Sequence, residues 1–113
     1  MPHPHTVKSE EELSDLFDEV KHETLVLVFT NGSIKELQFL LEVDETFGQA
    51  GENVIIRFIS ISTMPSLQET YSIEATPTFT FWRMFSGELG EMRGDRMVGT
   101  DTALLHQTLK RLL

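Results

Sequence analysis

Few side chains in this sequence could carry out covalent chemistry, and those few form no recognisable catalytic set. The chain has no cysteine, so its own residues supply no thiol nucleophile, no disulfide and no thiolate metal ligand. The stretch FTNGSIKEL, residues 29–37, offers the hydroxyl groups of Thr30 and Ser33, but no histidine lies near them in sequence to act as a base. We therefore expect no enzyme activity, and we keep a transferase or isomerase reaction at Ser33 or Thr30 as a less favoured alternative.

The four histidines do not have the spacing of a metal site, which needs three or four converging ligands. His3 and His5 alternate with prolines in MPHPH, and His22 and His106 are far from them in sequence. Asn31-Gly32-Ser33 matches an acceptor for N-glycosylation, but we interpret it as a turn in which Gly32 can take a positive φ. The sequence therefore implies no metal and no cofactor.

The charge of the chain is unevenly distributed, and it excludes some classes of partner. The formal net charge is −9, and residues 1–52 hold 12 of the 18 acidic residues but three of the nine basic ones. Nucleic-acid binding depends on a high density of cationic side chains. We therefore expect no direct contact with nucleic acid, and we expect the acidic half to favour basic partner surfaces.

The N-terminal sequence bears on localisation. The stretch MPHPHTVKSEEE lacks the basic region followed by an apolar region that marks a signal peptide. The longest apolar run is also too short to cross a bilayer. We expect a cytoplasmic protein that does not bind membranes, with the nucleus as the alternative location.

Hydrophobic patterning predicts helices that alternate with buried strands. Ser9 and Glu12 form a capping-box pattern, and the apolar residues behind them recur at helical spacing. The run LVLVFT has the length and continuous apolarity of a strand that is covered on both faces. In chain order we expect a helix from residue 9, a strand at 25–30, a helix at 34–47, a strand at 54–62, a short helix at 65–73, a strand at 78–82, an edge strand at 88–94 and a helix after Thr100 or Asp101.

This order predicts the fold class and a single domain. Strand–helix–strand units come first and an antiparallel pair comes last, which is typical of an α/β protein. We expect a mixed central sheet of four to five strands with helices on both faces. Residues 1–8 are expected to form a short extended tail, and 9–113 the domain.

The order of elements, together with ATPTFTFW at residues 75–82, resembles the thioredoxin fold over about residues 7–113. In that family a proline in the place of Pro77 forms a cis peptide bond and faces the active site. In an ungapped register, residues 33–37 (Ser-Ile-Lys-Glu-Leu) stand where the family carries Trp-Cys-Gly-Pro-Cys. The resemblance then implies an exposed Ile34 and a buried Leu37 at the two redox positions.

Other departures from the family pattern agree with a loss of redox function. Disulfide exchange needs an attacking thiolate and a resolving thiol, and this chain has neither. The buried acid that assists proton transfer in the family corresponds to Val28, and the proline that kinks the following helix corresponds to Glu42. The resemblance therefore implies a redox-inactive member that lacks the CxxC motif.

The resemblance also implies a surface for non-covalent binding. In thioredoxins the main chain of the residue before the cis proline pairs with an extended segment of the client protein, which requires no cysteine. The corresponding residues here are Asn31, Gly32, Ser33, Ile34, Thr76 and Pro77. The hairpin at 83–88 is a second candidate contact surface, with Met84 and Phe85 at its tip.

We therefore expect an adapter or scaffold module that binds a protein or peptide partner near the former active-site face. One alternative is a spliceosomal thioredoxin-like subunit, which shares a weak pattern with Ile61, Ser62, Pro65, Leu67 and Tyr71. Another is a homodimeric structural protein whose Ile34 face is buried against a second copy.

Overall fold

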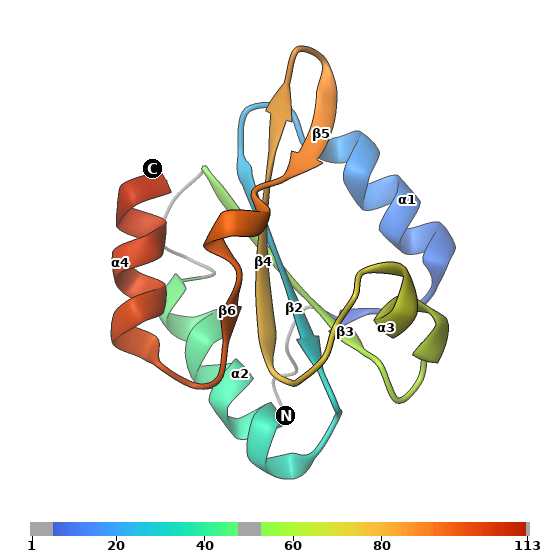
Figure 1. The fold of residues 1–113 in the computed structure, drawn as a ribbon, viewed down its shortest axis with the longest axis vertical. Coiled ribbons are helices and arrows are strands. Elements are labelled where there is room, and N and C mark those ends of the chain that lie inside the picture. Colours follow the sequence, from blue (N-terminus) through green and yellow to red (C-terminus); the bar gives the residue numbers. More distant parts are fainter. Residues whose placement is uncertain (1–5, 48–52, 113) are drawn as a thin grey trace.

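A mixed sheet forms the centre of the computed structural model, which describes residues 6–47 and 53–112 (Figure 1). Within these residues the strand order is β1-β3-β2-β4-β5, and β6 pairs with β4 beside this path. The β1–β3 and β3–β2 pairs are parallel, and all pairs made by β4 are antiparallel. The strands are β1 Thr6–Val7, β2 Thr24–Thr30, β3 Val54–Ser60, β4 Thr78–Phe85, β5 Glu88–Glu91 and β6 Met97–Val98.

Helices cover both faces of this sheet, which confirms the predicted fold class. Helices α1 and α3 lie on one side of the sheet, and α2 and α4 lie on the other (Figure 1). None of the helices within the described ranges is both long and apolar enough to span a membrane. The helices are α1 Glu10–Glu19, α2 Ile34–Phe47, α3 Pro65–Thr70 and α4 Thr102–Leu112, and a short 3₁₀ helix, η1, spans Arg93–Asp95.

Strand β2 is the centre of the core, as its continuous apolar sequence predicts. All seven of its residues are buried. Because successive side chains of a strand point to opposite faces, Val26 and Val28 pack on the side of α2 and α4. Leu25, Leu27 and Phe29 pack on the side of α1 and α3. The two apolar layers thus share one strand.

Two strands were not expected from the sequence, so the prediction of four to five strands is too low. Strands β1 and β6 have two residues each, which is too short for an alternating pattern to be recognised. Thr6 and Val7 pair with residues 58 and 59 of β3, and Val7 is buried. Residues 6 and 7, which were expected to belong to the extended tail, are thus paired with the central sheet. The rest of the expected tail, 1–5, lies outside the described residues, as do 48–52 and 113.

The β4–β5 hairpin is built on a two-residue turn. Ser86 and Gly87 both have positive φ, 51° and 84°, which suits the right-handed twist of the flanking strands. Phe85 is 53% exposed. Its ring nevertheless lies over Gly90, since a methyl group placed on Gly90 would be 3.3 Å from Phe85 Cδ2. Phe85 thus covers a glycine of the neighbouring strand.

Candidate functional site

The residues predicted to bind a partner fall into two groups at opposite ends of β4 (Figure 1). Pro77 directly precedes this strand and Phe85 ends it, so at about 3.3 Å per residue the two lie roughly 26 Å apart. The structure brings the turn at 31–34 together with Thr76 and Pro77. Met84 and Phe85 belong to a separate surface at the hairpin.

The turn between β2 and α2 is fixed by its own side chains. Asn31 Oδ1 accepts a hydrogen bond from Ser33 N at 2.8 Å, and Ser33 Oγ accepts one from Glu36 N at 3.3 Å. Ser33 is therefore the N-cap of α2, as predicted. Gly32 has a φ of +78°, and a methyl group there would lie 3.2 Å from Ser60 Oγ. Glycine is needed at this position for both reasons.

Glu36 connects three segments at this site, and sequence reasoning did not identify it. Its Oε1 accepts hydrogen bonds from Thr30 Oγ1 at 2.6 Å and from Asn31 N at 3.0 Å. Its Oε2 accepts one from Thr76 Oγ1 at 2.8 Å. The carboxylate thus joins the end of β2, the first turn of α2 and the turn before β4. The spacing Ser33-x-x-Glu36, that of a capping box, was the available signal.

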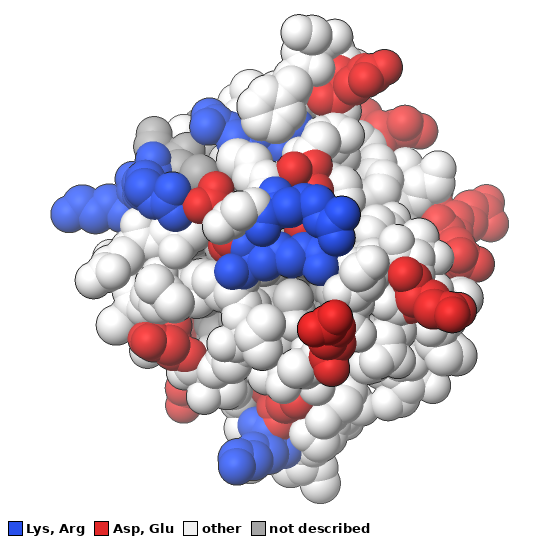
Figure 2. Space-filling view, viewed as in Figure 1, with Lys and Arg blue, Asp and Glu red and all other residues white. Residues whose placement is uncertain are grey.

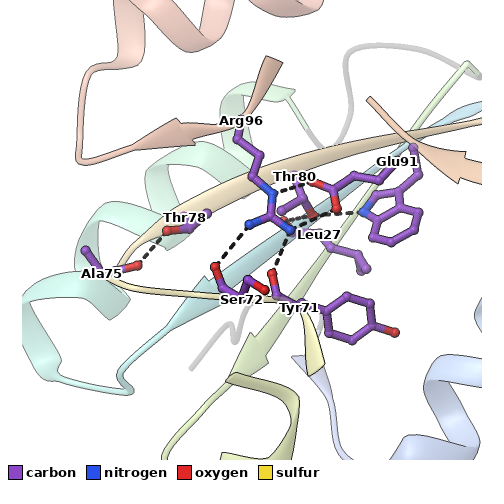
Figure 3. Close-up of polar contacts among 9 residues, drawn as sticks. Leu27, Tyr71, Ser72, Ala75, Thr78, Thr80, Glu91 and Arg96 are labelled. Atoms are coloured by element: carbon purple, nitrogen blue, oxygen red, sulfur yellow. Dashed lines mark hydrogen bonds and ion pairs between the residues drawn. The ribbon is translucent and has the colours of Figure 1, made fainter. Parts of the chain in front are cut away.

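Hydrogen bonds from Thr78 and Gly99 fix the main chain on either side of the Thr76–Pro77 bond. This peptide bond is cis, as the resemblance implies. Thr78 Oγ1 donates to the carbonyl of Ala75 at 2.5 Å across the turn (Figure 3), and Gly99 N donates to the carbonyl of Pro77 at 2.9 Å. Among the described residues, the main-chain N–H and C=O of Thr76 have no hydrogen-bond partner. Thr76 itself is half-buried, and Pro77 is buried.

Arg96 anchors the segment that leads into this turn (Figure 3). Its guanidinium donates to the carbonyls of Tyr71 at 2.7 Å and of Ser72 at 3.2 Å. It also forms a two-pronged ion pair with Glu91, in which the Arg96 and Glu91 side chains are 17% and 9% exposed. The hydrogen bond from this carboxylate is the main reason that the pKa of Arg96 is raised.

Exposed apolar side chains flank the turn. Ile34, at the start of α2, is 75% exposed, as the resemblance implies. Val98, which sequence reasoning did not single out, is 64% exposed and pairs with Thr78 across β6 and β4. The expectation of a buried Leu37 is wrong, because this side chain is 37% exposed. Glu36, one residue earlier, takes the inward-facing place at the start of the helix.

The hydroxyl groups of the turn take part in local hydrogen bonds. Ser33 Oγ caps the helix, and no histidine bonds to it among the described residues. Thr30 Oγ1 does contact the Glu36 carboxylate, but Thr30 is 6% exposed. No group of three or more histidine, aspartate or glutamate side chains in the described ranges could hold a metal ion. His3 and His5 lie outside these ranges.

Two cavities lie away from the predicted site. One, of about 330 Å³, adjoins the edge strand β1 and is lined by Thr6, Val7, Glu12, Asp15, Leu16, Glu19 and Arg57. The other, of about 190 Å³, lies between α1 and α3 and is lined by Glu10, Leu13, Ser14, Phe17, Leu67, Thr70 and Tyr71. The predicted site residues line neither cavity.

Replacing Glu36 with alanine is expected to lower the free energy of unfolding by about 1–3 kcal/mol, because the buried hydroxyl of Thr30 loses its acceptor. Glu36→Gln should lose less, since its amide oxygen can still accept the bonds from Thr30 and Asn31. Urea denaturation of both variants measures the difference. Equal denaturation midpoints for wild type and Glu36→Ala would show that the three bonds contribute nothing.

Comparison with known proteins gives matches among solved structures. No protein-family model and no curated protein matches this sequence. The structure is similar to Trichomonas vaginalis thioredoxin, with a TM-score of 0.81 and 14% identity over 97% of each chain. It is also similar to Fasciola hepatica thioredoxin, with a TM-score of 0.75 and 20% identity over 95% of this chain and 97% of that one.

A designed protein is a further similar structure, with a TM-score of 0.76 and 27% identity over 98% of each chain. The likeness to the two thioredoxins extends over nearly the whole chain. The redox motif itself has no counterpart, because this sequence contains no cysteine. The chain therefore has the thioredoxin fold without the two thiols that thioredoxin redox chemistry requires.

Proposed function

We propose that this chain is a protein-interaction module without thiol redox activity, which binds an extended segment of a partner protein along the Thr76–Pro77 turn. The observation that carries this proposal is the main chain of Thr76, a half-buried residue beside the start of α2, whose N–H and C=O have no hydrogen-bond partner among the described residues. An extended segment can add to such a backbone by main-chain hydrogen bonds, as in strand addition.

Apolar contacts on both sides of the turn support this mode of binding. The exposed Ile34 and Val98 offer places for the partner's side chains, while its main chain pairs with Thr76. The hydrogen bonds that Thr76 donates to Glu36 and Thr78 donates to Ala75 hold the turn in place before any partner binds. With no cysteine in this chain, the complex would be non-covalent and reversible.

Replacing Ile34 with aspartate is expected to abolish partner capture while changing the free energy of unfolding by no more than about 0.5 kcal/mol, because the side chain is exposed. Affinity capture with the wild-type chain, followed by mass spectrometry, identifies the partners to be compared. Chemical denaturation verifies that Ile34→Asp remains folded.

Phe85→Asp is the matched control for this experiment. It introduces the same side chain on another exposed apolar residue, at the far end of β4. Partners that are lost with Ile34→Asp and kept with Phe85→Asp would support the Thr76–Pro77 surface. The reverse result would move the proposed interface to the hairpin at Met84 and Phe85. Light scattering completes the test, since a dimer that Ile34→Asp dissociates would mean that a second copy occupies this surface.

A further inference from the structure

Helix α1 carries a dense negative charge that the proposed function does not use. Its ten residues, EEELSDLFDE, include six acids and no basic residue. Figure 2 shows acidic side chains along the side of the molecule where α1 and α3 lie in Figure 1. A surface of this sign attracts basic partners and speeds their association at low salt.

An apolar groove runs beside this charge. The cavity of about 190 Å³ between α1 and α3 has a floor of Leu13 and Leu67, which are both buried, and walls of Phe17 and Tyr71. Its α1 side is formed by residues 10, 13, 14 and 17, which are spaced along one face of two helical turns. The groove is large enough for a bulky apolar side chain.

Tilted and edge-to-face contacts between aromatic rings stiffen the walls of this groove. The ring centroids of Phe17 and Trp82 lie 5.4 Å apart, and those of Tyr71 and Trp82 lie 5.8 Å apart. Tyr71 also contacts Phe29 at 5.5 Å, and its carbonyl accepts a hydrogen bond from Arg96. Because these rings pack against the core, the groove is present before any ligand binds.

The negative charge of α1 affects the electrostatic environment of Tyr71 in the groove. Burial raises the pKa of Tyr71, and the negative charges of Glu10 and Glu91 raise it further. Glu10 lines the groove, and Glu11 and Asp18 come next around the exposed side of the helix. A ligand for this groove is therefore selected by an apolar contact and by positive charge together.

We propose that the groove between α1 and α3 binds a basic amphipathic helix of a partner protein. A large apolar side chain of that helix enters between Phe17 and Tyr71, and flanking lysine or arginine side chains face Glu10, Glu11 and Asp18. This is the helix-in-groove mode of recognition. The surface is separate from the Thr76–Pro77 turn, so the chain could hold two partner segments at once.

The chain contains its own optical reporters for a binding test. Tyr71 is the only tyrosine and Trp82 the only tryptophan of the sequence, and their rings are in contact beside the groove. The probe is a capped amphipathic peptide of leucine and lysine, with its leucines on one helical face. We expect a saturable change in Trp82 fluorescence that weakens as salt is added. The same peptide with glutamate in place of lysine should not bind.

A pair of variants tests whether the peptide binds in the groove. Ser14→Phe fills the groove from an exposed position of α1, and Ser66→Phe makes the same change at an exposed position of α3 outside the groove. We expect Ser14→Phe to weaken the affinity for the leucine–lysine peptide at least tenfold, a difference of about 1.4 kcal/mol in binding free energy. Ser66→Phe should bind like wild type. Thr70→Lys, which places a cation at the rim, provides a second variant and should also weaken binding.

The outcomes separate this proposal from the one above. Ile34→Asp should bind the leucine–lysine peptide with wild-type affinity. This expectation does not depend on whether Ile34→Asp loses partner proteins at the Thr76–Pro77 turn. Circular dichroism verifies that each variant is folded. The proposal is overturned if Ser14→Phe and Thr70→Lys both bind the peptide as tightly as Ser66→Phe, or if the leucine–glutamate peptide binds equally well.

Discussion

Replacing Arg96 with alanine is expected to lower the free energy of unfolding by about 2–3 kcal/mol, because a carboxylate and two carbonyls lose a charged hydrogen-bond donor. The Glu91 carboxylate, whose side chain is 9% exposed, would lose both hydrogen bonds from the guanidinium. The carbonyls of Tyr71 and Ser72 would each lose a charged donor. The cost arises from these unpaired groups rather than from the attraction that the pair once supplied.

Arg93→Ala is the matched control, because Arg93 is an exposed arginine three residues earlier in η1. It should change the free energy of unfolding by no more than about 0.5 kcal/mol. Adding Glu91→Leu to Arg96→Ala removes the orphaned carboxylate and should recover part of the loss. Urea denaturation of the four chains gives the comparison. Equal midpoints for Arg96→Ala and Arg93→Ala would exclude the anchoring role of Arg96.

Replacing Leu40 with alanine is expected to cost about 2–5 kcal/mol, as for other core leucines. Leu40 is 1% exposed and packs with Val26, Val43 and Phe79 in the layer beneath α2. The same change at Leu37, which is 37% exposed, should cost less than about 1 kcal/mol, because little apolar area leaves the core. The pair is well matched, since both leucines lie in the same helix.

Thermal or urea unfolding of the two alanine variants measures this difference. A large loss for Leu40→Ala with a small one for Leu37→Ala would confirm the orientation of α2. Comparable losses at both positions would instead support the burial of Leu37 that the ungapped register implied. The measurement thus tests which residues of α2 face the sheet.

Much of the fold could be predicted because it depends on local patterns. The apolar run of β2, the Asn-Gly-Ser turn and the N-cap at Ser33 are all recognisable within a few residues of sequence. The turn at Thr76–Pro77 was identified through its likeness to a known family. These features bring the residues of the candidate site together at one end of the sheet.

The rest could not be predicted, because it depends on partners far apart in the sequence. Glu36 accepts a hydrogen bond from Thr76, forty residues away, and Arg96 donates to Tyr71 and Ser72, which are 25 and 24 residues away. Strand β1 is defined only by its pairing with β3. The orientation of α2 was misjudged because a family register fixes the place of a helix more accurately than the direction of its side chains.

The Glu36 carboxylate has a consequence for the kinetics of any complex formed at this site. Because it ties the beginning of α2 to the turn before β4, the surface has little conformational freedom left to lose on association. The surface would already have its bound conformation when a partner docks there. The loss of conformational entropy on binding would then fall mainly on the partner segment. Its association rate would then reflect diffusion and orientation, and differences between partners would lie mainly in how long they stay bound.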